Sequence, residues 1–451
     1  MTVAAAQLSA LITELADLDL VRSGNQLQQL SHDQFAFSPL LAPQLQHCRA
    51  DLVVRVSSRD QVLRVAAACY RHGVPLTPRG AGTGNYGQCV PLEGGVVIDT
   101  SGLQQILELD HERGMLTAQP GCRLLDLDRA LQPHGWALRL APSTWRTATL
   151  GGFIAGGSSG VGSLRWGLLR DPGNLLGLEL VSLEAQPRLL QLGPQECRGL
   201  NHAYGSNGIF TAVTVPLAPW QNWQELVLRC PDRASALALG EQLSAAALDL
   251  DGLALLDGEL MERLPPLPGL DQQASPALLL LAAPAALPVI RELAQASGAR
   301  CVFERPQWPP KGLLLRELCW NHTTLQLRQQ DPSFTYQLLL LPDPVEPVLQ
   351  ALSERFPGWL HWHLERVRQG GRPRWVGFAL FRWAGEPRLL ELMDAARQLG
   401  CLVFNAHALT VEDGGLGVVD ADQVAAKQAY DPAGLMNPGK LRGWLERQSA
   451  P

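Results

Sequence analysis

Long hydrophobic runs, paired cysteines and excess basic charge are all missing from this sequence of 451 residues. The longest apolar stretch, residues 277–290, is broken by two prolines and is shorter than the about 20 residues that a membrane-spanning helix needs. None of the nine cysteines has Cys-x-x-Cys spacing, which argues against zinc ribbons and cysteine-ligated iron–sulfur clusters and favours a reduced, cytoplasmic setting. A net charge of −6 argues against a nucleic-acid-binding protein.

With 46% hydrophobic and 18% charged residues, the composition indicates a globular protein, and a length of 451 residues is enough for two or three domains. The first twenty residues carry three acidic side chains among their leucines and no basic segment, so we expect an amphipathic helix there rather than a signal peptide.

Glycine is concentrated in the segment Arg79-Gly80-Ala81-Gly82-Thr83-Gly84-Asn85-Tyr86-Gly87-Gln88, directly after a short apolar strand. Glycine costs backbone entropy, so this density predicts left-handed turns or a ligand lying against the main chain. Consecutive free N–H groups suit a phosphate, and Arg79 is placed to add charge-assisted contacts. The segment lacks the Gly-Lys-Ser/Thr of a P-loop, and residues 89–98 read as turn and strand rather than the helix of a Rossmann motif.

A second glycine-rich segment, residues 142–160, combines glycines with serine and threonine hydroxyls. Two such loops predict a diphosphate held from both sides. A third turn, residues 205–211, leads into a strand and could face an adenine or a flavin edge.

Strand and helix signals alternate over the first 220 residues, including a helix from the capping residue Ser58 to Gly73 and a second helix over residues 124–131. From residue 223 the pattern becomes strand–helix–strand–strand–helix–strand and then repeats between residues 334 and 404. We therefore expect two ferredoxin-like halves that share one antiparallel sheet.

Five ordered segments resemble a known family: residues 79–91, 142–160, 166–179, 205–211 and 431–440, which include the final Asn437-Pro438-Gly439-Lys440. In them the sequence resembles the FAD-linked oxidases of the vanillyl-alcohol oxidase and p-cresol methylhydroxylase (PCMH) superfamily, nearest to the glycolate oxidase flavin subunit and D-lactate dehydrogenases. The resemblance implies an α+β protein with a two-subdomain PCMH-type FAD-binding domain and a ferredoxin-like cap. The implied boundaries are 1–219 for the FAD-binding domain, 220–404 for the cap and 405–451 for a segment returning to the FAD-binding domain.

The resemblance also implies which residues bind the FAD, with its diphosphate between the first two loops. The implied FAD-binding residues are Pro78, Arg79, Gly80, Ala81, Gly82, Thr83, Gly84, Asn85, Tyr86, Gly87, Gln88, Pro142, Ser143, Thr144, Thr149, Leu150, Gly151, Gly152, Ala155, Gly156, Gly157, Ser159, Gly160, Val161, Gly208, Ile209, Asn437 and Lys440. For Lys440 a solvent-exposed lysine is the alternative. Thr83 stands where a linking histidine would sit and the second loop has no cysteine, so we predict non-covalent FAD. A covalent thioether bond from Cys89 or Cys122 to the flavin is the alternative, against which a small buried cysteine is expected.

Relatives that oxidise 2-hydroxy acids carry two histidine-containing metal motifs, and this chain departs from both. It has His361 and His363 at the first place and His407 at the second, so zinc binding is an alternative and no metal is the prediction. Oxidation of a hydroxy acid needs a base and a cation for the carboxylate. We predict His322 and His407 as bases and Arg328 and Arg366 as carboxylate ligands; an exposed polar segment over residues 320–328 and a charged turn over residues 365–368 are the alternatives.

The expected function is oxidation of a small 2-hydroxy acid of the glycolate or D-lactate type by hydride transfer to the flavin N5 of FAD. The alternatives are an FAD-dependent sugar, aldonolactone or other alcohol oxidase and a weakly catalytic flavin-binding subunit of a larger complex. The expected partner is the small-molecule substrate, with no nucleic acid and no membrane span. The electron acceptor and the choice between a homodimer and a partner subunit stay open.

Overall fold

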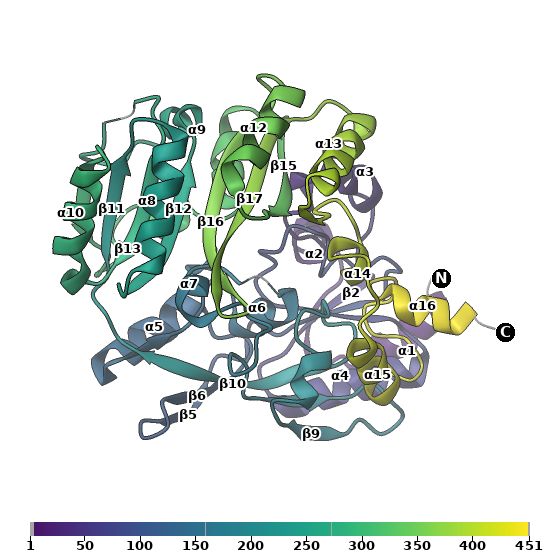
Figure 1. Cartoon of the computed structure of the whole chain (residues 1–451). Coiled ribbons are helices and arrows are strands. Elements are labelled where there is room, and N and C mark those ends of the chain that lie inside the picture. The colour runs from purple at the N-terminus through teal and green to yellow at the C-terminus, as the bar shows by residue number, and fades with distance from the viewer. Residues whose placement is uncertain (1–3, 158, 272, 450–451) are drawn as a thin grey trace.

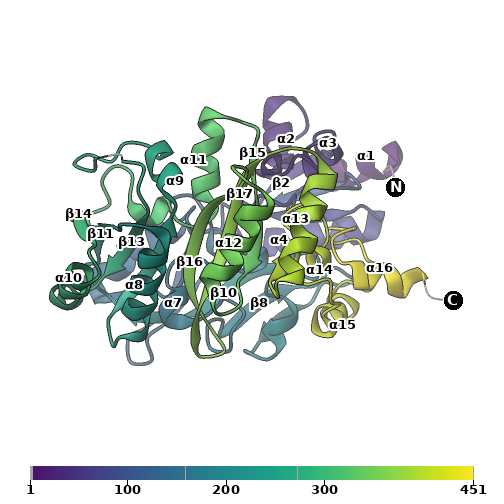
Figure 2. The ribbon, with the colours of Figure 1, turned by 45° about the horizontal axis from the view of Figure 1, so that its top comes forward.

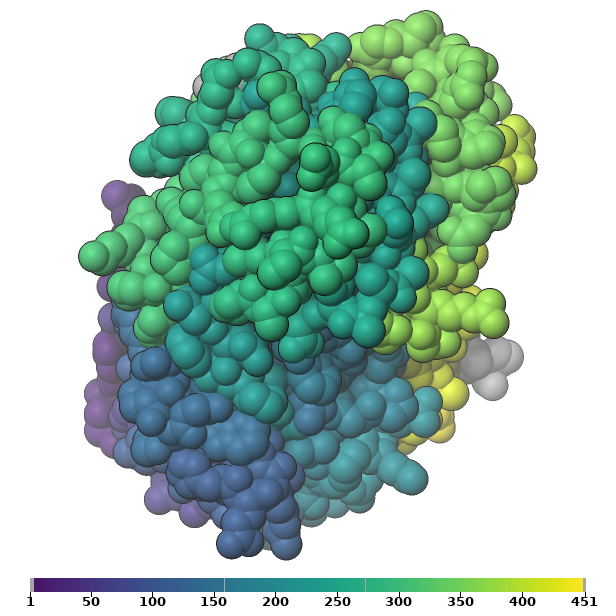
Figure 3. Space-filling model, turned by 60° about the vertical axis from the view of Figure 1, so that its left-hand side comes forward, coloured from purple at the N-terminus to yellow at the C-terminus, as the bar shows by residue number. Residues whose placement is uncertain are grey.

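The computed structural model describes residues 4–157, 159–271 and 273–449, and these residues form three β-sheets with helices packed against them (Figure 1). Two small sheets and their helices make the lower half of the view, and one large sheet makes the upper half. In Figure 3 the teal and green residues of the large sheet and its helices lie above the blue residues of the lower half and directly against them. Among the described residues, no helix has the length and apolar character needed to cross a membrane.

The first sheet has the strand order β1-β2-β4-β3 and is parallel except for its edge strand β1. Its strands are β1 Asp19–Val21, β2 Leu52–Arg55, β3 Leu76–Arg79 and β4 Val96–Asp99. Helix α4 (Arg59–His72) connects β2 to β3 with the predicted ends, because the Ser58 hydroxyl accepts a hydrogen bond from the Gln61 N–H and Gly73 adopts the left-handed conformation that ends a helix. The amphipathic N-terminal helix α1 (Ala5–Glu14) is confirmed and packs against α4.

The second sheet is antiparallel, with the order β5-β6-β10-β8-β9 and with β7 added beside β10. Its strands are β5 Ile106–Asp110, β6 Met115–Ala118, β7 Trp136–Leu138, β8 Gly177–Val181, β9 Leu189–Leu192 and β10 Ile209–Pro219. Helices α5 (Leu124–Leu131), α6 (Leu150–Gly156) and α7 (Ser163–Trp166) lie in the long connection between β6 and β8. The predicted helix over residues 124–131 and the strand after the third glycine turn are confirmed.

The third sheet is the predicted pair of ferredoxin-like halves, joined edge to edge by β12 and β16. The first half is β11 Gln224–Arg229, α8 Arg233–Ala245, β12 Leu250–Leu256, β13 Ala277–Ala282, α10 Leu287–Ala296 and β14 Arg300–Pro306. The second half is β15 Phe334–Leu340, α12 Val345–Arg355, β16 His361–Gln369, β17 Arg372–Arg382, α13 Glu386–Gln398 and β18 Leu402–Phe404. The alternative of a charged turn over residues 365–368 is wrong, because β16 continues to Gln369 and the turn falls at Gly370 and Gly371, both with positive φ.

The longer helices of this part of the chain cover one face of the sheet. Figure 2 shows α8, α12 and α13 in a row over it, and their apolar side chains join Leu226, Trp362 and Leu364 in one core. The opposite face packs Val227, Phe378 and their neighbours against α9 (Gly258–Arg263), α11 (His322–Gln330) and the lower half of the molecule. Because successive side chains along a strand point to opposite faces of the sheet, neighbouring residues of one strand belong to different cores.

After β18 the chain returns to the first sheet (yellow in Figure 1), where Met436 bridges to Leu76 of β3. The helices of this return are α14 Val411–Gly414, α15 Ala421–Tyr430 and α16 Arg442–Ser449. The remaining helices are α2 Gly24–Ser31, η1 Phe35–Phe37, α3 Leu41–Leu45, η2 Gln132–His134, η3 Glu196–Gly199, η4 Pro284–Ala286 and η5 Leu315–Glu317.

Candidate active site

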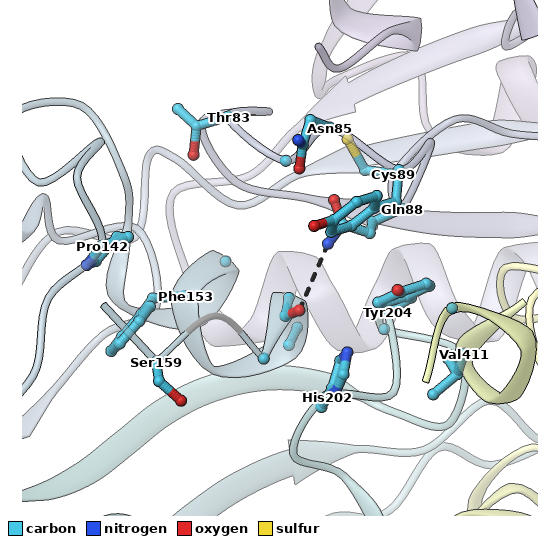
Figure 4. A pocket seen from close by; sticks show the side chains of 18 of the residues that line it. Thr83, Asn85, Gln88, Cys89, Pro142, Phe153, Ser159, His202, Tyr204 and Val411 are labelled. Carbon is cyan, nitrogen blue, oxygen red and sulfur yellow. Dashed lines mark hydrogen bonds between the residues drawn. The ribbon is translucent and has the colours of Figure 1, made fainter. Parts of the chain in front are cut away.

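A cavity of about 680 Å³ lies between the two glycine-rich loops, the face of the third sheet opposite α8, α12 and α13, and the C-terminal return segment. Its volume is within the range of cofactor and ligand sites. Figure 4 shows Thr83, Asn85, Gln88 and Cys89 on one side of it, with Pro142, Phe153 and Ser159 on another and His202 and Tyr204 below. Segments more than 300 residues apart in the chain therefore meet at one site.

The first loop, residues 79–88, approaches the second loop so closely that a side chain would not fit between them. A Cβ atom on Gly80 would lie 2.2 Å from the Thr149 hydroxyl oxygen. Gly82 has a φ of 67°, and a Cβ there would overlap the guanidinium of Arg79. The predicted need for bare backbone thus has two physical causes, which are contact with the second loop and a left-handed turn.

The second loop continues from Thr149 into α6, and the Thr149 hydroxyl accepts a hydrogen bond from the Gly152 N–H. Gly157 ends the helix with a φ of 74° and lies against the ring of His202. Gly160 has a φ of 78°, and a Cβ there would lie 2.1 Å from the carbonyl oxygen of Ala141. Ser158 of this loop lies outside the described residues.

Arg79 turns toward its own loop. Its guanidinium donates hydrogen bonds to the carbonyl oxygens of His32 at 2.8 Å and Ala81 at 3.4 Å and to the Cys89 sulfur at 3.2 Å. The Arg79 side chain therefore holds the loop closed, and its positive charge acts on the cavity from within the loop.

The side chains of Asn85, Tyr86 and Gln88 tie the first loop to its surroundings. The Asn85 amide donates to the Tyr336 hydroxyl at 3.1 Å, and the Tyr86 and Tyr336 hydroxyls lie 2.7 Å apart. The Gln88 amide donates to the Gly156 carbonyl at 3.4 Å, the dashed line in Figure 4. The Gln88 Oε1 atom is buried and has no hydrogen-bond donor.

Asn437 and Lys440 hold the first loop from behind and do not line the cavity. The Asn437 amide donates to the carbonyl oxygens of Gln88 at 2.8 Å and Tyr204 at 2.6 Å, and the Lys440 ammonium donates to the Gly87 carbonyl at 2.7 Å. Lys440 is fully buried, so the alternative of a solvent-exposed lysine is wrong.

Burial lowers the pKa of Lys440 to about 8, and the negative charge of Asp33 opposes this shift. Burial raises the pKa of Asp33 to about 6, and the charge of Lys440 opposes that shift in turn. The Asp33 Oδ1 atom accepts the Phe35 N–H at 3.0 Å, while its Oδ2 atom is buried without a donor. Asp33 lines the cavity, and nothing in its sequence context marked it.

Most of the residues predicted to bind FAD line the cavity. The ones that do so are Pro78, Arg79, Gly80, Ala81, Gly82, Thr83, Gly84, Asn85, Tyr86, Gln88, Pro142, Ser143, Thr144, Thr149, Gly151, Gly152, Ala155, Gly156, Gly157, Ser159, Gly208 and Ile209. The residues placed behind this wall are Gly87, Leu150, Gly160, Val161, Asn437 and Lys440.

None of the four residues predicted for substrate chemistry lines the cavity. Arg366 alternates with Val367 on β16, so Val367 faces the cavity while Arg366 faces the helices, stacks over Trp375 and donates to the Ser244 hydroxyl at 2.9 Å. Arg328 donates to the Phe334 carbonyl at 2.6 Å. His322 hydrogen-bonds the Glu317 carbonyl through Nδ1 at 3.1 Å.

Both ring nitrogens of His407 are engaged. Nε2 lies 3.1 Å from the Tyr336 carbonyl, which can only accept, so Nε2 carries a proton and donates it. Nδ1 lies 2.8 Å from the Ser38 hydroxyl and accepts from it in the neutral imidazole. Burial lowers the pKa of His407 to about 4, so the neutral form persists at pH 7.

The three histidines considered for a metal have separate partners. His361 pairs with Glu259 at 3.0 Å, His363 with Glu365 at 2.8 Å and His407 with Ser38. Within residues 4–157, 159–271 and 273–449, no group of three or more histidine, cysteine, aspartate or glutamate residues is placed to hold a metal ion.

The third sheet and the segments beside it contribute a wall without charge, which the sequence did not reveal. Its lining residues are Trp320, Asn321, Leu338, Leu340, Val367, Gln369, Val376, Phe378, Phe404, Asn405 and Ala406. We call this set the cap wall. The periodicity of β15, β16 and β17 indicated that one face of each strand was buried, but not which face met the cavity.

The fit of a flavin nucleotide can be tested on these features. Glycines of both loops line the cavity with bare backbone, whose N–H groups suit a diphosphate, and the buried Asp33 Oδ2 and Gln88 Oε1 atoms are acceptors without donors, which suit the hydroxyl groups of a nucleotide. Apolar and amide side chains of the cap wall suit a planar ring system. The residues present therefore fit FAD.

Comparison with known proteins agrees with this fit. Residues 50–186 match the FAD binding domain family. The chain is 33% identical over 203 residues to the glycolate oxidase subunit GlcD of Bacillus subtilis, covering 44% of this chain and 41% of that protein. It is 31% identical over 190 residues to a D-lactate dehydrogenase of Archaeoglobus fulgidus, covering 40% of this chain and 41% of that protein. The matches thus span about two fifths of the length of these curated relatives.

A solved structure of alkyldihydroxyacetonephosphate synthase superposes with a TM-score of 0.75 over 96% of this chain and 86% of that one, at 16% identity. This likeness establishes the fold alone. Together with the family match, it shows a fold shared with this synthase in which residues 50–186 match the FAD binding domain family.

Proposed function

We propose that this chain is an oxidoreductase that binds FAD non-covalently in the cavity and oxidises a small 2-hydroxy acid of the glycolate or D-lactate type. The observation that carries the proposal is the meeting of the two bare loops, with Gly80 against Thr149, at a cavity that the third sheet closes. The named activities of the relatives, glycolate oxidase and D-lactate dehydrogenase, support the substrate class.

The residues proposed to hold FAD are the cavity-lining members of the two loops and of residues 205–210. When bound, FAD supplies an acceptor for the hydride removed from the substrate carbon. The loops supply N–H groups to the diphosphate, and Thr83 and Ser159 add hydroxyl donors. The cap wall excludes water from the other side, which strengthens every polar contact inside.

Non-covalent binding is supported by the state of the two thiols. Cys89 lines the cavity, but burial raises the pKa of its thiol to about 11, opposite to the change that makes a reactive thiolate. Burial also raises the pKa of Cys122 to about 11, and its sulfur lies against the Gln105 carbonyl.

A second candidate, oxidation of an uncharged alcohol, is favoured by the cap wall. A buried carboxylate needs a cation, and the arginines that line the cavity, Arg79 and Arg170, already have partners: loop carbonyls for Arg79 and the Asp420 carboxylate at 2.6 Å for Arg170. The third possibility, a flavin-binding subunit with little activity of its own, is consistent with the engaged nitrogens of His407.

Two measurements test the proposal. The purified protein is first titrated with FAD and then denatured; a yellow complex that releases all its flavin supports non-covalent binding, and a protein that stays colourless contradicts the proposed function. The complex is then mixed anaerobically with matched pairs that differ only in charge, D-lactate against D-lactamide and glycolate against glycolamide.

The loss of visible flavin absorbance decides between the candidates. Faster bleaching by the acids supports the hydroxy-acid activity, and faster bleaching by the amides supports the uncharged alcohol. Bleaching by none of the four, with full reduction by dithionite as the control, supports a flavin-binding subunit.

A further inference from the structure

Trp320 occupies a strained corner of the cap wall. It precedes α11, lines the cavity with Asn321, and has a φ of 55°, one of only four positive values among the described non-glycine residues. A tryptophan in the left-handed region costs about 1 kcal/mol or more, so neighbouring contacts must hold it there. Its ring packs edge-on against Phe378 of the cap wall, 6.0 Å between centroids.

The contact that restrains the Trp320 backbone is a buried carboxylate. The Trp320 N–H donates to the Glu365 Oε1 atom at 2.6 Å, and Glu365 is only 3% exposed. Hydrogen bonds to an ionised acceptor are about twice as strong as neutral ones. Glu365 does not line the cavity, although Val367, two residues further along β16, does.

Glu365 is fixed in turn by a closed chain of hydrogen bonds. His363 Nε2 lies 2.8 Å from Glu365 Oε1, and His363 Nδ1 lies 2.8 Å from the Thr323 hydroxyl. The Thr323 hydroxyl donates its proton to the Leu318 carbonyl at 2.7 Å, so its oxygen accepts from Nδ1. Nε2 must then also carry a proton to donate to the Glu365 carboxylate, which makes His363 and Glu365 a buried ion pair. His363 and Thr323 have no exposed surface, and the His363 ring stacks on Phe378 at 5.3 Å.

We propose that Glu365 is a positioning residue, which fixes the Trp320 ring and the Asn321 amide at the cap wall so that they contact the bound flavin nucleotide. Glu365, His363 and Thr323 do not line the cavity, and Glu365 acts on the site through the Trp320 backbone. This inference rests on the proposed binding of FAD.

The test compares FAD complexes of the wild type, Glu365→Gln, Trp320→Gly and the double variant. Glutamine keeps an acceptor oxygen but loses the charge, which should raise the dissociation constant for FAD about fivefold and alter the visible circular dichroism of the bound flavin. Glycine adopts a positive φ without strain, so Glu365 has nothing to restrain in the Trp320→Gly background. There, adding Glu365→Gln should change FAD affinity less than about twofold.

Glu225→Gln is the matched control for a purely structural effect. Glu225 is also fully buried in the same sheet, accepts the Leu315 N–H at 2.7 Å and pairs with Arg305 at 2.7 Å, but it does not line the cavity. Both Glu225→Gln and Glu365→Gln should lower the urea concentration at the midpoint of unfolding. Glu225→Gln should leave the FAD affinity and the circular dichroism of the bound flavin unchanged.

The outcomes separate this inference from the proposed function. A wild type that fails to bind FAD contradicts the proposed function itself. A wild type that binds FAD, with a Glu365→Gln variant of unaltered affinity and dichroism, or with equal effects of Glu365→Gln in both backgrounds, overturns the positioning role alone.

Discussion

Replacing Lys440 by methionine should change how stability depends on pH. Lys440 is fully buried, and burial lowers its pKa from 10.5 to about 8. Each pKa unit corresponds to about 1.4 kcal/mol, so the charged ammonium costs the folded state about 3 kcal/mol at pH 7. Methionine removes this cost but leaves the Gly87 carbonyl without its donor, at about 1 to 3 kcal/mol. The two effects nearly offset near pH 7, so the variant should fold.

The sign of the pH dependence follows from proton binding. Between pH 8 and 10.5 the unfolded lysine holds more protons than the folded one, so the free energy of unfolding rises with pH in that range. Wild type should gain up to about 3 kcal/mol relative to Lys440→Met between about pH 7 and about pH 10. Because Asp33 loses its compensating charge, the variant should also show a further raised pKa for Asp33.

Urea unfolding followed by far-UV circular dichroism at the two pH values measures this difference, and FAD titration at pH 7 reports on the loop. Lys440→Arg keeps the charge and is the control for side-chain volume. An unchanged difference between wild type and Lys440→Met at the two pH values would refute the assignment of a buried, titrating lysine behind the loop.

Three further outcomes are expected. Gly160→Ala should lower the free energy of unfolding in urea by about 3 kcal/mol or more, because a Cβ at this positive φ meets the Ala141 carbonyl. Gly135 has a similar φ but free space around it, so Gly135→Ala should lower the free energy of unfolding by only about 1 kcal/mol. Equal losses in the two variants would contradict the contact with Ala141. Burial lowers the pKa of His407 to about 4, so the folded state loses stability as pH falls from 6.5 toward 4. His407→Gln should reduce this loss of stability in acid. Acid-unfolding curves of wild type and variant that run parallel would contradict the lowered pKa of His407. Gly80→Ala should weaken FAD binding about tenfold or more, because the added Cβ pushes the loops apart. Adding Thr149→Ala to this variant should restore part of the affinity, although it removes an N-cap worth about 1 kcal/mol. FAD titrations that show no recovery would contradict the close contact between the two loops.

The elements that could be predicted from the sequence are those with strong local signals. Ser58 and Gly73 mark the ends of α4 through capping chemistry that needs no tertiary context. The repeated strand–helix order from β11 to β18 follows from periodicity and from turn residues. Strands β8 and β9 were missed as a pair because their burial depends on β10, which follows them in the chain.

The site divides in the same way. The loops around Gly80 and Gly151 were visible because their chemistry lies in the backbone, and glycine reports backbone demands directly. The cap wall was not visible, because one residue separates Val367 in the cavity from Arg366 behind the sheet, and composition does not fix that register. Asp33 and Trp320 reach the cavity from loops whose paths depend on long-range packing.

The return of residues 427–440 to the nucleotide loops bears on how the protein is made. Lys427 donates a hydrogen bond to the Ser206 carbonyl at 2.6 Å, while Asn437 and Lys440 donate hydrogen bonds to the backbone carbonyls of residues 87, 88 and 204. On a ribosome the early sheets and the large sheet emerge first, and domains of a growing chain tend to fold as they appear. The two glycine-rich loops would then lack these contacts until residue 440 leaves the exit tunnel, so cofactor loading would follow the synthesis of the return segment.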